Sequence, residues 1–424
     1  MARILTPVDA CTLVQAMVEE MTGQSGSIQT VDSSNFVSVG ESILRSGTEN
    51  VLNTLSLVLG RTFMAVRPYK AKLMIINSMN SGLYANRIRK ISFYSRPAQN
   101  SGAFNTVDNS GATLYTNLNM GYDNGSNSGA SLPTMWEQNT PVPLEFNFGG
   151  GSVWDDSTTV YEDQLQVAFR SPEDFAAFVN GIMVEKGNDI ESQKEAFNRM
   201  TLLNYMAGIY DLNAVNGAAI DLTAAYNTDR ALSPAVTTAQ ILGTPALLED
   251  FVKFFVETVK VLSDQLTHRS IKYHWSPTKT IGGVNYELLR HTPKDKQKLI
   301  LYKPFWIRAE STVMPTIFNP EYLKIENFEG VDYWQNENAP MAIDVTPSIP
   351  DTTDPTAQIA GSNVALDNVL GVLYDEDAIM IDYQLEAAYS TPVEARKRYR
   401  NMWWHFKKNA INDFTENGIL LYMG

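Results

Sequence analysis

The clearest hydrophobic pattern in the chain predicts a long helix that begins near Ser171. Ser171-Pro172-Glu173-Asp174 joins an N-cap serine to a proline at the first helical position and an acidic residue three positions after the cap. The helix has roughly 36 residues and a length of about 54 Å, although Gly181 and Gly187 each cost about 1 kcal/mol relative to alanine. Apolar residues recur at helical spacing to about residue 210, around a polar middle over 186–194: Phe175, Val179, Ile182, Met183, Ile190, Phe197, Met200, Leu203 and Ala207.

Two shorter helical patterns come before it, over residues 14–21 and 39–58, and a Ser/Gly/Thr/Gln-rich link over 23–34 separates them. Neither segment has enough apolar residues to form a core of its own. We therefore expect residues 1–60 to be arm-like elements that pack on something outside the segment.

Residues 63–170 predict an excursion of two long strands with a decorated tip. A strand is indicated over 86–95, residues 144–148 alternate between apolar and polar, and 164–169 are interpreted as the returning strand. Residues 97–157 are dense in Asn, Gly, Ser and Thr, and a structureless loop of that length is uncommon inside a compact domain. We interpret them as a surface insertion or an excursion with hairpins of its own.

Helix and strand patterns alternate after the long helix. Thr244-Pro245 begins a second helix, with an apolar stripe from Leu248 to Leu266. Further patterns predict a buried strand over 299–302, a Pro-rich linker over 345–363, two strands at 368–374 and 378–383 around an acidic turn, and a last strand at 418–423.

Two signals conflict near the C-terminus. Thr391-Pro392-Val393-Glu394 is a capping box, which predicts the start of a helix. The residues after it alternate, with Tyr399, Asn401 and Trp403 on one side and Arg400, Met402 and Trp404 on the other. We favour a strand over 398–406.

Composition limits the classes of function. The chain has 424 residues, of which 44% are hydrophobic, so it can bury a sizeable core. Its formal net charge of -14 argues against a surface that grips nucleic acid throughout. The single cysteine, Cys11, excludes an internal disulfide and is expected to be a small apolar residue. Without a targeting pattern or a transmembrane-length apolar run, we expect a soluble protein made in the cytoplasm.

The residue types that carry catalysis or bind metals form no recognisable pattern. Gly149-Gly150-Gly151 lacks the lysine and the helix of a phosphate-binding loop and is interpreted as a hairpin turn. The histidines, at 268, 274, 291 and 405, have no metal-ligand spacing and are expected at the surface or partly packed. Asp375-Glu376-Asp377 is interpreted as a solvated acidic turn. We therefore expect no enzyme activity, no catalytic residue, no cofactor and no metal.

Basic residues gather in two places on this acidic chain: Arg87, Arg89, Lys90 and Arg96 in the excursion, and Arg396, Lys397, Arg398 and Arg400 near Trp403 and Trp404. Basic residues beside aromatic ones can bind nucleic acid. We favour ion pairing with an acidic neighbour, such as an adjacent subunit. The candidate inter-subunit contacts are these arginines and Lys90, together with the acidic Glu173 and Asp174.

The order of elements resembles the Hong Kong 97-type capsid fold of tailed-bacteriophage major capsid proteins. Residues 34–44 (SNFVSVGESIL) are similar to the arm of podovirus-like head proteins. Residues 371–380 (GVLYDEDAIM) resemble the family's late strand between its axial and peripheral domains, and 398–405 (RYRNMWWH) its aromatic C-terminal strand. The resemblance covers nearly all of the chain.

This resemblance implies an α+β fold with an N-terminal arm, an extended two-stranded loop, a long spine helix, and peripheral and axial domains. The implied boundaries are 1–62 for the arm, 63–170 for the extended loop with its insertion at about 97–157, and 171–240 for the spine helix and peripheral domain. Residues 241–374 correspond to the axial domain and 375–424 to the return to the peripheral domain.

The implied function is that of a major capsid protein, which self-assembles into the icosahedral shell around a double-stranded DNA genome. The implied partners are further copies in pentamers and hexamers, a scaffolding protein, the portal and a decoration protein, with no membrane. The DNA would be enclosed without sequence-specific binding. The implied location is the virion capsid, assembled in the cytoplasm of the host bacterium.

Three other functions stay open at this point. An encapsulin-like nanocompartment shell has the same fold but encloses a cargo enzyme. A secreted or surface protein that binds carbohydrate or adheres is suggested by the aromatic, Asn/Gly-rich middle, but it lacks paired carboxylates and a signal peptide. A metal-dependent enzyme built on the acidic turn has too few ligands.

Overall fold

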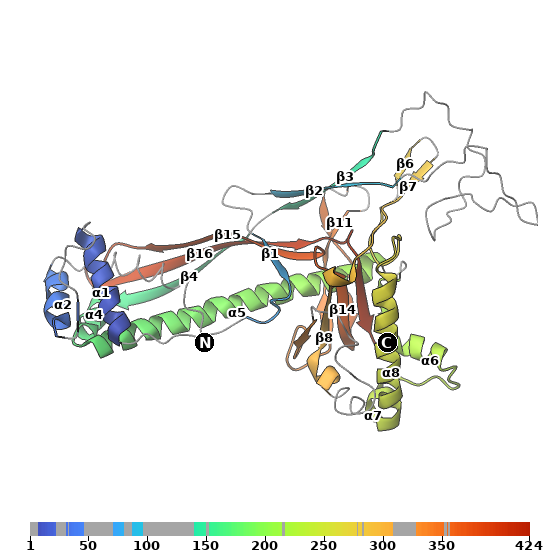
Figure 1. Cartoon of the computed structure of the whole chain (residues 1–424), viewed down its shortest axis with the longest axis horizontal. Coiled ribbons are helices and arrows are strands. Elements are labelled where there is room, and N and C mark those ends of the chain that lie inside the picture. The colour runs from blue at the N-terminus through green and yellow to red at the C-terminus, as the bar shows by residue number, and fades with distance from the viewer. Residues whose placement is uncertain are drawn as a thin grey trace, which may run out of the picture.

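The structure is a computed structural model, which describes residues 7–22, 31–32, 34–45, 71–79, 87–95, 140–149, 152–213, 217–277, 279–281, 284–307, 328–351, 354 and 357–424. It is a mixed α+β fold with a long limb and a wider body (Figure 1). Most of the predicted insertion, at 97–139, lies outside the described residues.

The long helix joins the limb to the body. The predicted helix is confirmed as α5 (Pro172–Asn213), whose 42 residues give a length of about 63 Å. The predicted cap is present, because the Ser171 hydroxyl accepts a hydrogen bond of 3.1 Å from the backbone N–H of Asp174. α5 runs along the limb and ends against the body (Figure 1).

The helices of the predicted arm pack at the far end of the limb. α1 (Pro7–Thr22), α2 (Phe36–Arg45) and α4 (Glu162–Ala168) meet the start of α5 there (Figure 1). The Phe36 ring lies 6.3 Å from that of Phe169 and 6.0 Å from that of Phe175. We call the buried cluster that includes these rings, Val14, Met17, Val179 and Trp404 the distal core. The arm helices therefore find their burial partner within the chain.

A four-stranded sheet lies along α5, in the order β1 (Asn77–Met79), β15 (Ile379–Ser390), β16 (Tyr399–Asn412) and β4 (Ser152–Tyr161). β15 and β16 form a long antiparallel ribbon. The predicted alternation of β16 is confirmed, because Arg400, Met402 and Trp404 are buried and the residues between them are half-buried. The sequence Thr391–Glu394 caps no helix; the Thr391 hydroxyl accepts a hydrogen bond from the backbone N–H of Asn401, across the end of the ribbon.

Charged side chains fill the middle of the layer between α5 and this sheet. Lys186 Nζ lies 2.9 Å from Asp156 Oδ1 and 5.7 Å from the centre of the Trp404 ring. Lys194 Nζ lies 3.5 Å from Glu191 Oε1, and both side chains are almost fully buried. Within the polar stretch 186–194, Lys186, Glu191 and Lys194 therefore make internal ionic contacts, whereas residues 188, 189 and 192 are exposed.

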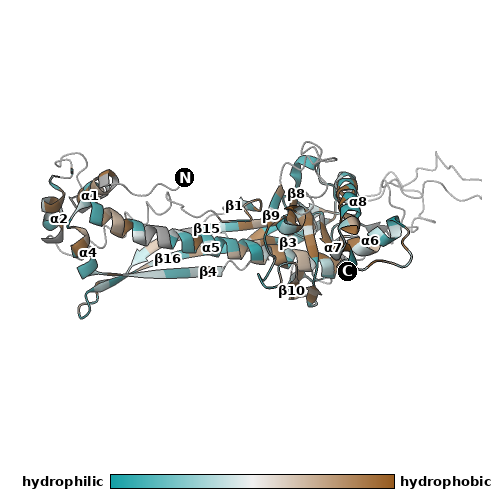
Figure 2. Ribbon diagram, turned by 90° about the horizontal axis from the view of Figure 1, so that it is seen from below, coloured by the Kyte–Doolittle hydropathy of each residue, from teal (hydrophilic) through white to brown (hydrophobic). Residues whose placement is uncertain are grey.

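The body is built on a five-stranded sheet, in the order β5 (Ala219–Asp221), β17 (Gly418–Tyr422), β14 (Val369–Asp375), β8 (Gln297–Tyr302) and β9 (Phe328–Val331). Every residue of β14 is buried. α8 (Pro245–Gln265) supplies Phe251 and Phe255 to one buried cluster with Leu373, and α5 supplies Tyr205 to another with Val372. The hydrophobic residues of β8 and β9 contrast with the more hydrophilic β4 of the limb (Figure 2).

Two predicted strands form a hairpin that projects from the body. β2 (Arg87–Phe93) and β3 (Pro143–Gly149) pair antiparallel, with Arg87 opposite Gly149 and Phe93 opposite Pro143. The pair lies above the junction of limb and body in Figure 1. We call β2–β3 the projecting hairpin.

The return from the excursion differs from the prediction. Residues 164–169 were expected to be a strand, but most of them belong to α4, where Glu162 and Asp163 in the first turn favour a helix through its dipole. The returning strand is β4, which pairs with β16. β3 pairs with β2 and not with β4. Residues 150 and 151 of the hairpin turn expected at the three glycines lie outside the described residues.

The remaining elements are short. α6 (Leu222–Asp229) and α7 (Thr238–Gly243) accompany α8, and β6 (Lys279–Ile281) pairs with β7 (Val284–Tyr286) ahead of the 3-10 turn Lys294–Lys296. The linker expected over 345–363 contains paired strands, because buried Ile349 and Val364 fix it to the body. These strands are β10 (Ile343–Val345) with β13 (Val364–Leu366), and β11 (Ser348–Pro350) with β12 (Gln358–Ala360).

Candidate subunit interfaces

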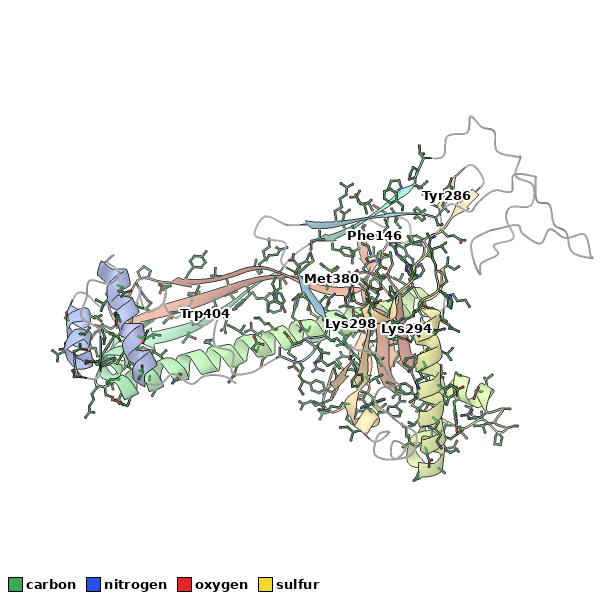
Figure 3. The ribbon with its side chains drawn as sticks, in the orientation of Figure 1. Phe146, Tyr286, Lys294, Lys298, Met380 and Trp404 are labelled. Carbon is green, nitrogen blue, oxygen red and sulfur yellow. The ribbon has the colours of Figure 1, made fainter. Side chains whose placement is uncertain are left out.

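The outer face of the projecting hairpin exposes large apolar side chains. Ile91 is 51% exposed and Phe93 is 59% exposed, whereas Phe146 on the inner face is 4% exposed. Phe146 lies on the side towards the body (Figure 3), with its ring 6.0 Å from that of Trp275. A ribbon whose inner face is buried and whose outer face exposes Ile91 and Phe93 beside charged residues is a candidate site for contact with another molecule.

The basic residues predicted in this segment do not form one patch. Arg89 points outward and pairs with Glu145 at 2.5 Å, whereas Lys90 points inward to Asp413 and Glu416. Their opposite directions follow from the alternation of side chains along a strand. Arg87 is the first residue of β2, its side chain lies outside what the structure describes, and so does Arg96.

The second basic group lies at the distal end of the limb, in the turn between β15 and β16. We call residues 391–398 the distal turn. Arg398 Nε lies 2.9 Å from Glu162 Oε2, and its Nη2 lies 3.5 Å from Asp163 Oδ1. Arg396 and Lys397 are exposed. Arg398 is therefore paired with α4, whereas Arg396 and Lys397 present their positive charge to the solvent.

Arg400, Glu173 and Asp174 have different surroundings from one another. Arg400 is only 2% exposed within a single chain, so it is a poor candidate for a surface contact. Glu173 and Asp174 are exposed in the first turn of α5, where the helix dipole stabilises acidic side chains. These two carboxylates remain candidates for contact with a neighbour.

An exposed strand edge on the limb was not found from the sequence. In the part of the chain that the structure describes, β4 pairs only with β16, and its other edge is open. Val153 is 63% exposed and Trp154 is 47% exposed on this strand. The signal available in the sequence was this pair of adjacent apolar residues ahead of the polar run 155–159. Neighbouring residues of a strand point to opposite faces, so the two cannot both reach one core.

The acidic turn after β14 is partly internal, contrary to the prediction of a solvated turn. Asp375 is 5% exposed and accepts a hydrogen bond of 2.7 Å from the Thr292 hydroxyl. Burial raises the pKa of Asp375. Glu376 pairs with Lys296 at 2.9 Å. Within the described ranges, no group of His, Cys, Asp and Glu residues is placed to hold a metal ion.

Two further residues can now be compared with their predictions. Cys11 is buried in the distal core, as expected of a small apolar residue. His274 is fully buried, not at the surface, with Nε2 2.8 Å from the carbonyl oxygen of Leu288 and Nδ1 3.0 Å from that of Lys272. Burial lowers the pKa of His274. No helix in the described part of the chain is long and apolar enough to cross a membrane.

An elongated subunit with a projecting hairpin, uncovered apolar residues and open strand edges has the features of a protein that is completed by its neighbours. Residues 153–422 match the family model for the Phi29-like phage major capsid protein. The chain belongs to this family, and it is a structural protein that forms the shell of a phage head. The match to a phage capsid family favours the phage shell over the nanocompartment and adhesive alternatives.

Solved structures of phage capsids are similar to this chain. The capsid structure of Staphylococcus phage Andhra is 11% identical, with a TM-score of 0.49, and the match covers 84% of this chain and 85% of that chain. A chain in the structure of native bacteriophage P68 is 10% identical, with a TM-score of 0.48, over 84% and 88%. The mature capsid of bacteriophage PhiM1 is 10% identical, with a TM-score of 0.39, over 84% and 87%. No curated protein matches the chain.

Proposed function

We propose that this capsid protein assembles as rings of five and six copies into a closed icosahedral shell around double-stranded DNA. The observation that carries the proposal is the outer face of the projecting hairpin, where Ile91 and Phe93 remain exposed in the single chain. In the shell, this face packs on an adjacent copy and removes both side chains from water. A ring of identical, head-to-tail contacts closes when the rotation between copies is a fifth or a sixth of a turn.

Electron microscopy of the purified protein, alone and with a candidate scaffolding protein, tests this proposal. Closed shells, tubes, or rings of five and six copies are the expected result. A monomer or small dimer under every condition contradicts self-assembly by this chain.

The proposed partners follow from assembly of this kind. We propose a scaffolding protein during assembly, the portal at one vertex and a decoration protein on the outer surface, with assembly in the host cytoplasm. We also propose that the chain has no enzyme activity of its own. Co-purification of each partner with shells from infected cells tests these interactions one at a time.

We propose that the shell encloses DNA without sequence-specific binding. The net charge of -14 supports this, because an acidic protein gains little from phosphate contacts. The DNA can then slide as it is loaded and released. Tight, salt-sensitive binding of DNA fragments by assembled, empty shells would contradict the proposal.

We propose that the distal end of the limb forms a second contact between copies. Arg396 on the distal turn and Glu173 and Asp174 on α5 are exposed charges of opposite sign at this end. We also propose that the extended loop ends near residue 149, because β4 pairs with β16 and belongs to the sheet of the limb. The other boundaries, after residues 62, 240 and 374, are kept as proposed above.

A further inference from the structure

The inner face of the projecting hairpin carries one cation among apolar residues. Ile88, Lys90 and Ser92 of β2 alternate with the outward residues, opposite Phe148, Phe146 and Leu144 of β3. The Lys90 side chain is 27% exposed, and its amino group contacts Asp413 and lies 2.5 Å from Glu416 Oε1. The side chains of Asp413 and Glu416 are 2% and 15% exposed, so the contact is largely internal.

A second cation from the body completes the group. Arg290 Nε lies 3.4 Å from Glu416 Oε1, and its Nη2 donates a hydrogen bond of 2.7 Å to the hydroxyl of Ser92. Both polar residues of the inner face of β2 are therefore bound to the same group. We call Lys90, Arg290, Asp413 and Glu416 the ionic cluster; it balances two positive charges against two negative ones.

The two carboxylates of the ionic cluster belong to a turn that is held in place by hydrogen bonds and ring stacking. Asp413 and Glu416 lie in the turn between β16 and β17, which joins the sheet of the limb to the sheet of the body. Asp413 Oδ1 accepts hydrogen bonds from the backbone N–H of Thr415 at 3.0 Å and from its hydroxyl at 2.6 Å. Phe414, between them, stacks on Tyr205 of α5 with ring centres 5.5 Å apart.

The close approach of α5 to this turn depends on a glycine. A Cβ atom at Gly208 would lie 2.3 Å from the ring of Phe414, so a larger residue there would displace the turn. The position of the two carboxylates is thus set by the helix that joins the limb to the body.

An ionic contact of this kind fixes the orientation of the hairpin more than it adds to the free energy of unfolding. Replacing a buried ion pair by apolar residues is often neutral for stability, whereas removing one partner leaves an unpaired buried charge. The apolar contacts beneath the hairpin are non-directional and allow it to slide or tilt. Although burial opposes it, the nearby Asp413 and Glu416 carboxylates raise the pKa of Lys90, so this cation keeps its charge at neutral pH.

We propose that the ionic cluster is a latch that fixes the direction in which the projecting hairpin leaves the subunit. The latch holds the outer face where an adjacent copy can meet it. This second part rests on the proposed function of the hairpin in assembly, and the first part does not.

Hydrogen exchange of the full-length, unassembled subunit at neutral pH tests the first part. K90M is expected to speed exchange of the amides of β2 and β3 about tenfold or more, while β14 and β17 keep their protection. R89M is the matched control. Arg89 is the next residue of the same strand and also pairs with a carboxylate, but its side chain is 58% exposed and points outward. Equal exchange in K90M, R89M and the wild type would overturn the latch.

A second variant distinguishes a loosened hairpin from a general loss of stability of the subunit. K90M/D413N removes one charge of each sign and leaves the pair of Arg290 with Glu416 in place, so no net charge stays buried. This variant is expected to fold with wild-type resistance to urea and still to exchange its hairpin faster than R89M. If K90M/D413N protects the hairpin as well as the wild type does, the cluster affects only folding and the proposal is wrong.

Assembly of the same variants tests the second part. Both variants are expected to give fewer closed shells, or irregular ones, under conditions where the wild type forms regular shells. Normal shells from a variant with a loosened hairpin would overturn the link between latch and assembly. Failure of the wild type to assemble would instead overturn the proposed function, because the exchange result does not depend on assembly.

Discussion

The projecting hairpin and the β15–β16 ribbon are both antiparallel pairs, but the chain covers them differently. The buried face of β16, with Met402, Trp404 and Phe406, lies in the distal core, and its other face mixes polar residues with Trp403. The outer face of the hairpin instead exposes Ile91 and Phe93. A strand pair whose apolar face is covered by its own chain needs few apolar residues on its outer face. A strand pair that exposes large apolar residues there is a candidate for contact with another molecule.

Removing the outer apolar residues of the hairpin should have the largest effect of all the changes considered. It should prevent assembly and leave the stability of the subunit almost unchanged. We expect I91S/F93S to abolish closed shells while changing the free energy of unfolding by about 0.5 kcal/mol or less, since both side chains are exposed. Electron microscopy and urea unfolding measure the two effects. N147S, on the same outer face, is the control and should assemble normally; shells from I91S/F93S would show that this face is not an interface.

Truncating a side chain on the buried face of β16 should instead lower the stability of the single subunit. W404A removes a side chain that is 5% exposed in the distal core, so we expect a loss of about 3–5 kcal/mol in the free energy of unfolding. W403A is its matched control, because Trp403 is the next residue and points away from that core. Urea unfolding should separate the two variants clearly. Equal losses would mean that both faces of the ribbon are packed alike.

The ion pairs in the middle of the limb should contribute less to the free energy of unfolding than Trp404 does. K186M removes a largely buried contact with Asp156, and we expect a loss of about 2 kcal/mol. K253M breaks an exposed helical pair with Glu249 and should cost about 0.5 kcal/mol or less. Thermal unfolding of both variants at several salt concentrations measures the difference. A cost for K186M as small as that for K253M would show that the middle of the limb is effectively solvated.

The segment that leads into the hairpin should show the smallest effect, and it should depend on pH. The Lys72 amino group, hydrogen-bonded to Asp332, lowers the pKa of that carboxyl below 3.8. Its stabilising contribution is therefore present above about pH 4 and is lost as the pH falls through the lowered pKa. Because both side chains are about half exposed, we expect D332N to cost less than about 1 kcal/mol at pH 7.

Unfolding of D332N and the wild type from pH 7 down to pH 2 measures this dependence. The two stabilities should converge at the acid end. A difference that stays constant across this range would show that the contact does not depend on the charge of Asp332.

The elements that could be predicted are those whose signals are local. The cap at Ser171 and the helical spacing after it predicted α5, and the alternation from Tyr399 predicted β16 against a competing capping box. The capping box failed because Thr391 hydrogen-bonds across the ribbon to Asn401, a partner that only the folded ribbon supplies.

The elements that could not be predicted depend on contacts between distant residues. The distal core joins Phe36, Phe169 and Trp404, and no local pattern relates these positions. The burial of Asp375 and the inward direction of Lys90 likewise depend on partners far along the chain. Lys90 was predicted to contact an adjacent subunit, but its acidic partners Asp413 and Glu416 lie in the same chain, which only the fold reveals.

The span of α5 has a mechanical consequence. One helix of about 63 Å joins the distal core to the turn beneath Phe414, so the limb acts as a lever whose fulcrum is the body. A rotation of about 5° at the body would move the far end by about 5 Å, a distance comparable to one helical turn. A small change in the orientation of the body is therefore magnified at the tip of the limb.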